Sequence, residues 1–94
     1  MAEASVRTIG LPWYDRADYP AIRSLMADPQ SLAPTYDLWL MAAQNNESVA
    51  QQAGLRVVRV PIRPDAFAQW CAERGLTLDG SARAKFAQSM AASG

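Results

Sequence analysis

The clearest pattern of apolar and polar positions lies in "RVVRVPIR", residues 56–63. Its side chains alternate between the two sides of an extended backbone, and this period of two predicts a β-strand. Arg59 and Arg63 fall on one side. The apolar residues of the opposite side are Val58, Val60 and Ile62. Pro61 has no backbone N–H to donate, so the strand is expected at the edge of a sheet or in a two-stranded ribbon.

A strand needs a partner, because it cannot satisfy its own backbone N–H and C=O groups. Residues 5–9 show a fainter alternation of the same kind, which Gly10 and Pro12 then interrupt. The strand at 56–63 is therefore expected to pair either with residues 5–9 or with a second chain.

Four further segments have the apolar spacing of amphipathic helices. They are 15–28, 35–53, a segment from Pro64 to the stop signal Gly75, and a segment that follows a cap at Thr77 or Asp79. Thr35 is a good cap for the second helix, and Gly54 stands where a left-handed stop residue belongs. Asn45 and Asn46 are poor helix formers, so the pattern leaves open whether the helix at 35–53 is continuous through them.

The apolar stripes of these helices supply the expected core. Its residues are Tyr19, Ile22, Leu25 and Met26, then Leu38, Trp39, Ala42, Val49 and Ala53, then Phe67, Trp70 and Cys71, and finally Ala82, Phe86 and Met90. The predicted fold class is mostly α with a small β-ribbon (α+β), with about four helices and one strand. A chain of 94 residues supports a single small domain over 1–94, with fraying expected at 1–4 and 91–94.

The net charge of zero conceals an asymmetry between the two halves of the chain. Residues 1–54 carry three arginines against six carboxylates, whereas residues 55–94 carry five arginines and one lysine against three carboxylates. A basic half can face nucleic acid or an acidic partner. Because an excess of three charges makes only a weak field, attraction between the two halves within one molecule is the preferred interpretation.

The chain has few residues of the types that usually act in catalysis or bind metals. It has no histidine, and its single cysteine, Cys71, falls on an apolar helical stripe where burial is expected. A glycine-rich phosphate loop and a cysteine–histidine metal pattern are both absent from the sequence. The carboxylates Asp15 and Asp18 stand at a helix start, where capping explains them, and Asp37 is the other candidate for acid–base work. We therefore expect no catalytic residue, no cofactor and no metal.

Other sequence features concern location. No apolar run is long enough to cross a bilayer, and no signal-peptide pattern begins the chain. One cysteine fits a reducing compartment. Abundant alanine and an eight-to-one ratio of arginine to lysine are typical of a GC-rich bacterial genome. The expectation is a bacterial cytoplasmic protein without a membrane partner.

Nearly the whole chain, from Leu11 to Gln88, resembles a family of small, uncharacterised proteobacterial proteins. The segments that carry the resemblance are "LPWYDRADYPAIRSLM", "TYDLWLMAA", "RVVRVPIRPDAFAQWCAERGL" and "ARAKFA". The resemblance implies a compact cytoplasmic domain and brings no activity and no functional residue with it.

Residues 56–90 are similar in topology to the ribbon–helix–helix DNA-binding fold. In that fold two chains pair their strands into an antiparallel ribbon that enters the major groove, and a second helix begins near a phosphate. The resemblance implies that Arg59 and Arg63 lie on the reading face of the ribbon, and that the amides after Thr77 lie near the DNA backbone.

The same stretch departs from that pattern in two ways. Arg63 precedes Pro64, where the family has an apolar residue of the inner face, and Pro61 occupies a reading position that calls for a hydrogen-bonding side chain. About fifty residues also precede the strand, where those repressors have few. Fold analogy alone is a weak basis for a function.

Together these features predict a small non-enzymatic protein-interaction module that binds another protein or a second copy of itself. The alternative is a ribbon–helix–helix-like dimeric regulator that binds DNA, and an enzyme of unknown type comes third. The candidate contact residues, for a partner or for nucleic acid, are Arg59, Arg63 and Thr77.

Overall fold

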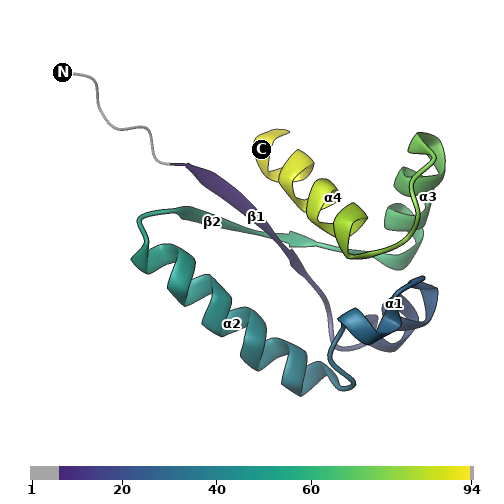
Figure 1. Ribbon diagram of the computed structural model, residues 1–94, viewed down its shortest axis with the longest axis horizontal. Helices are drawn as coiled ribbons and strands as arrows, with labels where there is room; N and C mark the ends of the chain where they lie inside the picture. The colour runs from purple at the N-terminus through teal and green to yellow at the C-terminus, as the bar shows by residue number, and fades with distance from the viewer. Residues whose placement is uncertain (1–6, 94) are drawn as a thin grey trace.

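A computed structural model describes residues 7–93 and has a mixed α+β fold, as predicted. In chain order its elements are β1 (Thr8–Trp13), α1 (Tyr19–Leu25), a short 3₁₀ turn η1 (Pro29–Ser31), α2 (Tyr36–Gln52), β2 (Arg56–Pro61), α3 (Pro64–Arg74) and α4 (Gly80–Ser93). The described part of the chain therefore contains four α-helices and one two-stranded sheet (Figure 1). Residues 1–4 and 94, where fraying was expected, lie outside the described residues.

The two strands pair in parallel within the chain, in a register that runs from Thr8 opposite Arg56 to Trp13 opposite Pro61. The prediction that this strand would pair with residues 5–9 or with a second chain is not confirmed as stated, because the partner strand found within the chain is β1, Thr8–Trp13. Only Thr8 and Ile9 of that segment belong to β1, and residues 5 and 6 lie outside the described residues. A parallel pair needs a long crossover between its strands, and α1 and α2 provide it.

Prolines within both strands are tolerated because they face away from the shared ladder. Arg56 N donates to Arg7 O and Ile62 N donates to Trp13 O, each at 2.9 Å. The backbone groups of Arg56 and Ile62 thus point toward β1. Because the direction alternates from residue to residue, the backbone of Pro61 points away from β1, to the outer edge of β2. Pro12 likewise faces the outer edge of β1, and for this reason it does not interrupt the strand as the sequence pattern suggested.

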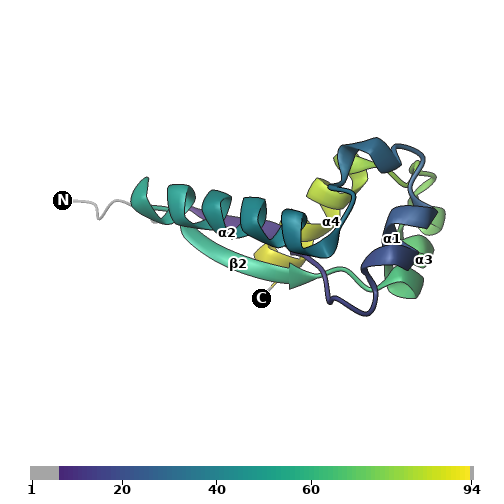
Figure 2. The same cartoon turned by 90° about the horizontal axis from the view of Figure 1, so that it is seen from below.

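Helices cover both faces of this small sheet, with α2 on one side and α4 on the other (Figure 1). On the α2 face, Arg59 of β2 contacts Glu47 of α2, and the Trp13 ring lies 5.2 Å from the Trp39 ring. On the α4 face, Gly10 approaches the helix closely. Figures 1 and 2 both show α2 running along β2. The result is a three-layer arrangement of helix, sheet and helix.

The contact between β1 and α4 depends on the absence of a side chain at Gly10. A Cβ atom built at this position would lie 2.2 Å from the backbone oxygen of Ala87 and 3.0 Å from the Cβ of Ala91. Both alanines are buried. Small residues on the strand and on the helix thus bring the two backbones together.

Aromatic side chains dominate the core around α1 and α2. Tyr14, Tyr19 and Trp39 are buried, and the ring centroids of Tyr14 and Trp39 lie 4.8 Å apart. A second group joins α3 and α4, where Phe67, Phe86 and Trp70 meet edge to face. Phe67 and Cys71 are buried, as the apolar stripe of the third helix predicted.

Other predicted core residues are exposed, and this part of the prediction is corrected. They are Leu25, Leu38, Val49 and Met90, together with Ala42 and Ala53. Helix α2 buries Trp39, as predicted, but together with Ala43 and Ala50 in place of the other residues of the predicted stripe. The Trp39 ring packs into the aromatic cluster, so the helix is rotated toward these three residues and leaves Leu38 half exposed.

The residues that begin and end helices α2 and α3 agree with the sequence prediction. The Thr35 hydroxyl accepts a hydrogen bond from Leu38 N at 3.2 Å, and α2 runs without a break through Asn45–Asn46. Gly54 and Gly75 follow α2 and α3 with positive φ angles of 87° and 64°. The first helix is shorter than the expected 15–28, at Tyr19–Leu25, and the capping explanation for Asp18 is corrected, because its side chain makes no capping hydrogen bond.

Candidate functional site

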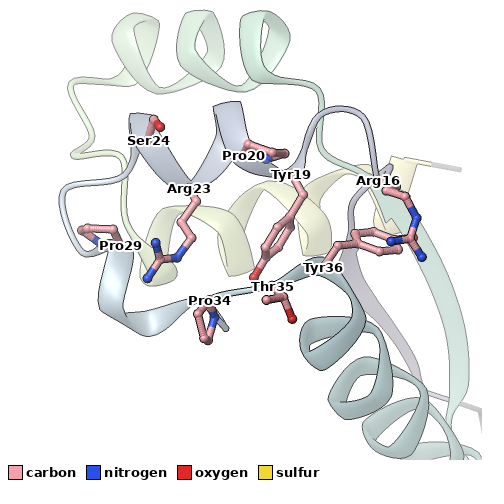
Figure 3. A pocket seen from close by; sticks show the side chains of 9 residues that line it. All are labelled: Arg16, Tyr19, Pro20, Arg23, Ser24, Pro29, Pro34, Thr35 and Tyr36. Carbon is pink, nitrogen blue, oxygen red and sulfur yellow. The ribbon is translucent and has the colours of Figure 1, made fainter.

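A pocket of about 490 Å³ lies between α1 and the loop that leads into α2 (Figure 3). Its lining consists of Arg16, Tyr19, Pro20, Arg23, Ser24, Pro29, Pro34, Thr35 and Tyr36. The Tyr19 hydroxyl donates to the carbonyl oxygen of Ala33. Three prolines fix the backbone of the walls, so the pocket is largely preformed.

Arginines flank this pocket, and they differ in their contacts. Arg16 forms an ion pair with Asp37 at 2.7 Å, and its guanidinium lies 4.6 Å from the centre of the Tyr36 ring. Arg23 forms no ion pair among the described residues, and its Nε is buried without a hydrogen-bond partner. The lining holds no carboxylate and no thiol, and its side chains able to exchange a proton are Tyr19 and Tyr36. Tyr19 already donates to Ala33 O, and burial raises its pKa, so the two arginines suit the pocket to an anion more than to acid–base work.

A smaller cleft of about 320 Å³ lies beside the outer edge of β1, and a buried arginine forms part of its wall. Arg83 is 6% exposed and donates to the hydroxyl of Ser31 at 3.0 Å. Its Nη1 lies 3.6 Å from Oδ1 of Asp28, and Oδ2 of Asp28 accepts from Gly80 N at 3.1 Å. This network joins η1 to the first turn of α4, and its geometry is that of a structural link.

Ionisable groups around the cleft have shifted pKa values with clear causes. The hydrogen bond from Gly80 N lowers the pKa of Asp28, and Arg83 also contributes to this shift. Burial raises the pKa of Tyr14 to about 12, against a smaller opposing effect of Arg83. Asp28 is therefore held ionised and Tyr14 neutral at neutral pH, which suits a structural role.

Because its folded-state pKa is lowered, Asp28 stabilises the fold above its ordinary pKa of 3.8 and loses that contribution as the pH falls through the lower folded value. We expect Asp28→Asn to remove this pH dependence. Urea unfolding of both proteins from about pH 5 to about pH 2 measures it, since that interval spans the protonation of a stabilising carboxylate. The wild-type free energy of unfolding should fall more steeply, and parallel curves would contradict the assignment. Asp15→Asn, at an exposed carboxylate without such contacts, is the control.

The candidate contact residues Arg59, Arg63 and Thr77 do not form one site in the described structure. Arg59 makes a two-pronged contact with Glu47, at 2.7 and 2.8 Å, and its guanidinium lies 4.0 Å from the centre of the Trp13 ring. Arg63 Nε lies 2.8 Å from an oxygen of Asp18. Thr77 is exposed and does not cap α4.

Asp79 is the residue that caps α4, with its carboxylate accepting from Ala82 N at 2.9 Å. The preferred interpretation of the charge asymmetry is confirmed by three ion pairs that link the acidic first half to the basic second half. They are Arg59 with Glu47, Arg63 with Asp18, and Arg83 with Asp28. These arginines are therefore engaged within the molecule.

The outer edge of β1 is closed by a side chain of α4. Oε1 of Gln88 accepts from Gly10 N at 3.0 Å, and Nε2 of Gln88 donates to Thr8 O at 3.1 Å. The amide thus occupies the positions that a third strand would take. Nothing in the sequence pattern singled out Gln88, although a glycine inside a strand pattern signals the close approach of another backbone.

The outer edge of β2 carries unpaired backbone groups. The backbone N–H and C=O groups of Val57 and Arg59 point away from β1. They have no hydrogen-bond partner among the described residues. Arg56, Arg59 and Pro61 are exposed, and Val57 is half-buried. Within residues 7–93, no helix backbone and no side chain bonds to the backbone groups of this edge.

Cys71 is buried, and burial raises the pKa of its thiol, which disfavours the reactive thiolate. Within residues 7–93 no three cysteine, histidine or carboxylate side chains gather closely enough to hold a metal ion. None of the helices in the same range is long and apolar enough to cross a membrane.

Comparisons with known proteins assign no family. No protein-family model, no curated protein and no solved structure matches this chain. The features that bear on function are therefore the open strand edge, the pockets and the ion pairs.

Proposed function

We propose that this chain is a non-enzymatic protein-interaction module that binds an extended segment of a partner along the outer edge of β2. The observation that carries the proposal is the pair of unsatisfied residues, Val57 and Arg59, on that edge. A free strand edge is a template for another strand, and main-chain hydrogen bonds then supply much of the affinity.

The surroundings of the edge favour this function. A two-stranded sheet is only marginally stable by itself and gains from additional strands. The Gln88 side chain already occupies the β1 edge, and α2 and α4 cover the two faces. A partner strand can therefore extend the sheet only beyond β2.

DNA binding receives less support from the same contacts. A ribbon that reads DNA must present a bare face to the major groove. Here the face that bears Arg59 packs against α2, with Arg59 bound to Glu47, and Arg63 is paired with Asp18. For these reasons we propose protein binding in preference to DNA binding.

A synthetic strand peptide tests the proposal. We expect acetylated and amidated Thr-Val-Thr-Val-Thr-Val, added to the ¹⁵N-labelled chain, to shift the amide signals of Val57 and Arg59 and to slow their hydrogen exchange. Signals of the inward-facing Val58 and Val60 should change less. Val57→Pro removes one outward N–H without touching the ladder to β1 and should abolish the effect. Val57→Thr keeps this N–H and is the matched control.

The titration is made at a protein concentration at which sedimentation shows a monomer, because a second copy on the same edge would compete with the peptide. No change at Val57 and Arg59 in that sample up to about 1 mM peptide, the range of weak encounters, would contradict strand addition. Binding of duplex DNA that is lost on combined replacement of Arg59 and Arg63 by alanine, and that falls with rising salt, would instead support the regulator.

A further inference from the structure

We infer that the partner segment is β2 of a second copy of this chain, paired antiparallel with Val58 next to Val58 of the partner subunit. This inference rests on the proposed function and deepens it, because it names the occupant of the edge and its register. It comes from the hydrogen-bonding capacity of each residue along β2.

Two-fold symmetry about Val58 places Val57 opposite Arg59 of the partner subunit, and Arg59 opposite Val57 of the partner subunit. When the backbone groups of two opposed residues in an antiparallel pair point toward each other, the residues exchange two N–H···O=C bonds. Two such pairs use every outward N–H and C=O of Val57 and Arg59 in both copies. Every backbone N–H and C=O of these two residues that is free in the single chain then has a partner.

A shift of the symmetry axis toward Pro61 is less favourable. With the axis at Arg59, the Val57 carbonyl faces Pro61 of the partner subunit, which has no N–H to donate. Arg59 also stands directly opposite Arg59 of the partner subunit, and like charges at opposed positions destabilise a strand pair.

A shift in the other direction meets a different obstacle. With the axis at Val57, the Arg59 carbonyl faces Leu55 of the partner subunit. The Leu55 N–H already donates to Ala50 O within its own chain, at 3.1 Å. Among the symmetric registers that oppose outward-facing residues, the one centred on Val58 therefore satisfies the most backbone groups.

Side chains agree with the same register. Val58 and its symmetry mate lie side by side on the α4 face in a non-hydrogen-bonded pair, where Cα atoms approach to about 4.5 Å. Arg59 stands opposite a valine and keeps its contacts with Glu47 and Trp13 on the α2 face. Arg56 stands opposite Val60 of the partner subunit, so no like charges are directly opposed.

The assembled sheet has the order β1–β2–β2–β1. Four strands with helices on both faces form a sheet of ordinary size, in contrast to the two strands of the single chain. The dimer thus removes the exposed edge of β2.

Disulfide trapping tests the register. In a Cys71→Ala background, which removes the buried native thiol, we expect Val58→Cys to form a linked dimer at least tenfold faster than Arg59→Cys or Val57→Cys under mild oxidation. The reason is that only Val58 stands directly opposite its own copy, at a Cα separation of about 4.5 Å that a disulfide can span. Two copies of residue 57, or of residue 59, are offset diagonally by about 7–8 Å. Adding Val57→Pro should prevent the link, whereas adding Val57→Thr should preserve it.

The outcomes separate the inference from the proposed function. Equal or faster linking of Arg59→Cys or Val57→Cys would overturn the register, and linking that survives Val57→Pro would overturn pairing along this edge. If none of the cysteine variants links while the peptide still shifts Val57, the second copy is excluded and the interaction function stands. If the peptide also has no effect, both fail.

Discussion

Replacing Gly10 with alanine is expected to lower the free energy of unfolding by about 3 kcal/mol, the upper end of the usual cost of overpacking. The new Cβ would lie 2.2 Å from the backbone oxygen of Ala87, a distance that requires α4 to move. Moving α4 also displaces Gln88 from the β1 edge and leaves Gly10 N and Thr8 O without their partner. A small domain with a total stability of 5–15 kcal/mol would lose a large share of it.

Urea unfolding monitored by tryptophan fluorescence measures this loss. Gly80→Ala is the matched control, because its Cβ would meet no atom closer than the side chain of Arg83 at 3.4 Å. We expect that half-buried variant to stay within about 0.5 kcal/mol of the wild type, because 3.4 Å is an ordinary van der Waals contact that requires no movement. A Gly10→Ala protein as stable as the Gly80→Ala protein would show that α4 does not contact β1 in this way.

Phe67→Ala is expected to cost about 3–5 kcal/mol, the range for removing a buried phenylalanine. Phe67 has no exposed surface, and its ring meets the Phe86 ring edge to face with centroids 5.6 Å apart. Truncation leaves a cavity between α3 and α4, where the surrounding aromatic rings are too rigid to collapse into it fully. The midpoint of urea or thermal unfolding should fall accordingly.

Leu38→Ala is the informative comparison for Phe67→Ala. Leu38 is also a large apolar residue of a helical stripe, but it is 50% exposed. We expect its replacement to change the free energy of unfolding by no more than about 0.5 kcal/mol. A loss comparable to that of Phe67→Ala would mean that α2 buries the face chosen from the sequence pattern.

Features that depend on a few neighbouring residues were predictable from the sequence. The cap at Thr35, the stops at Gly54 and Gly75, and the strand at β2 all follow from local backbone chemistry. The core stripe of α3 was also found, because Phe67 and Cys71 lie on its only strongly apolar face.

Features that depend on distant segments were not predictable in the same way. The sequence pattern put Leu38 and Trp39 on one stripe of α2, and the spacing alone cannot show which of these two neighbours faces the core. The choice is made by Tyr14 and Tyr19, whose rings pack against Trp39. The parallel pairing of β1 was missed for a similar reason, since its prolines face outward only in this register.

The candidate site shows the same division. Arg59 and Arg63 were recognised as side chains on the outer side of a strand, but the sequence pattern did not identify Glu47 and Asp18 as their partners. The open edge of β2 can be identified only when the register with β1 is known, because the register decides which backbone groups point outward. Pro61 gave the right indication that this strand lies at an edge.

The amide of Gln88 has a consequence for the size of any assembly that this chain forms. A sheet with two open edges can add copies without limit, in the manner of a growing fibre. Here Gln88 occupies one edge by binding Gly10 and Thr8, so each chain can offer only one. On the inferred pairing of β2 with its own copy, growth ends after a single addition, because the Gln88 amide rather than another strand binds the remaining edge.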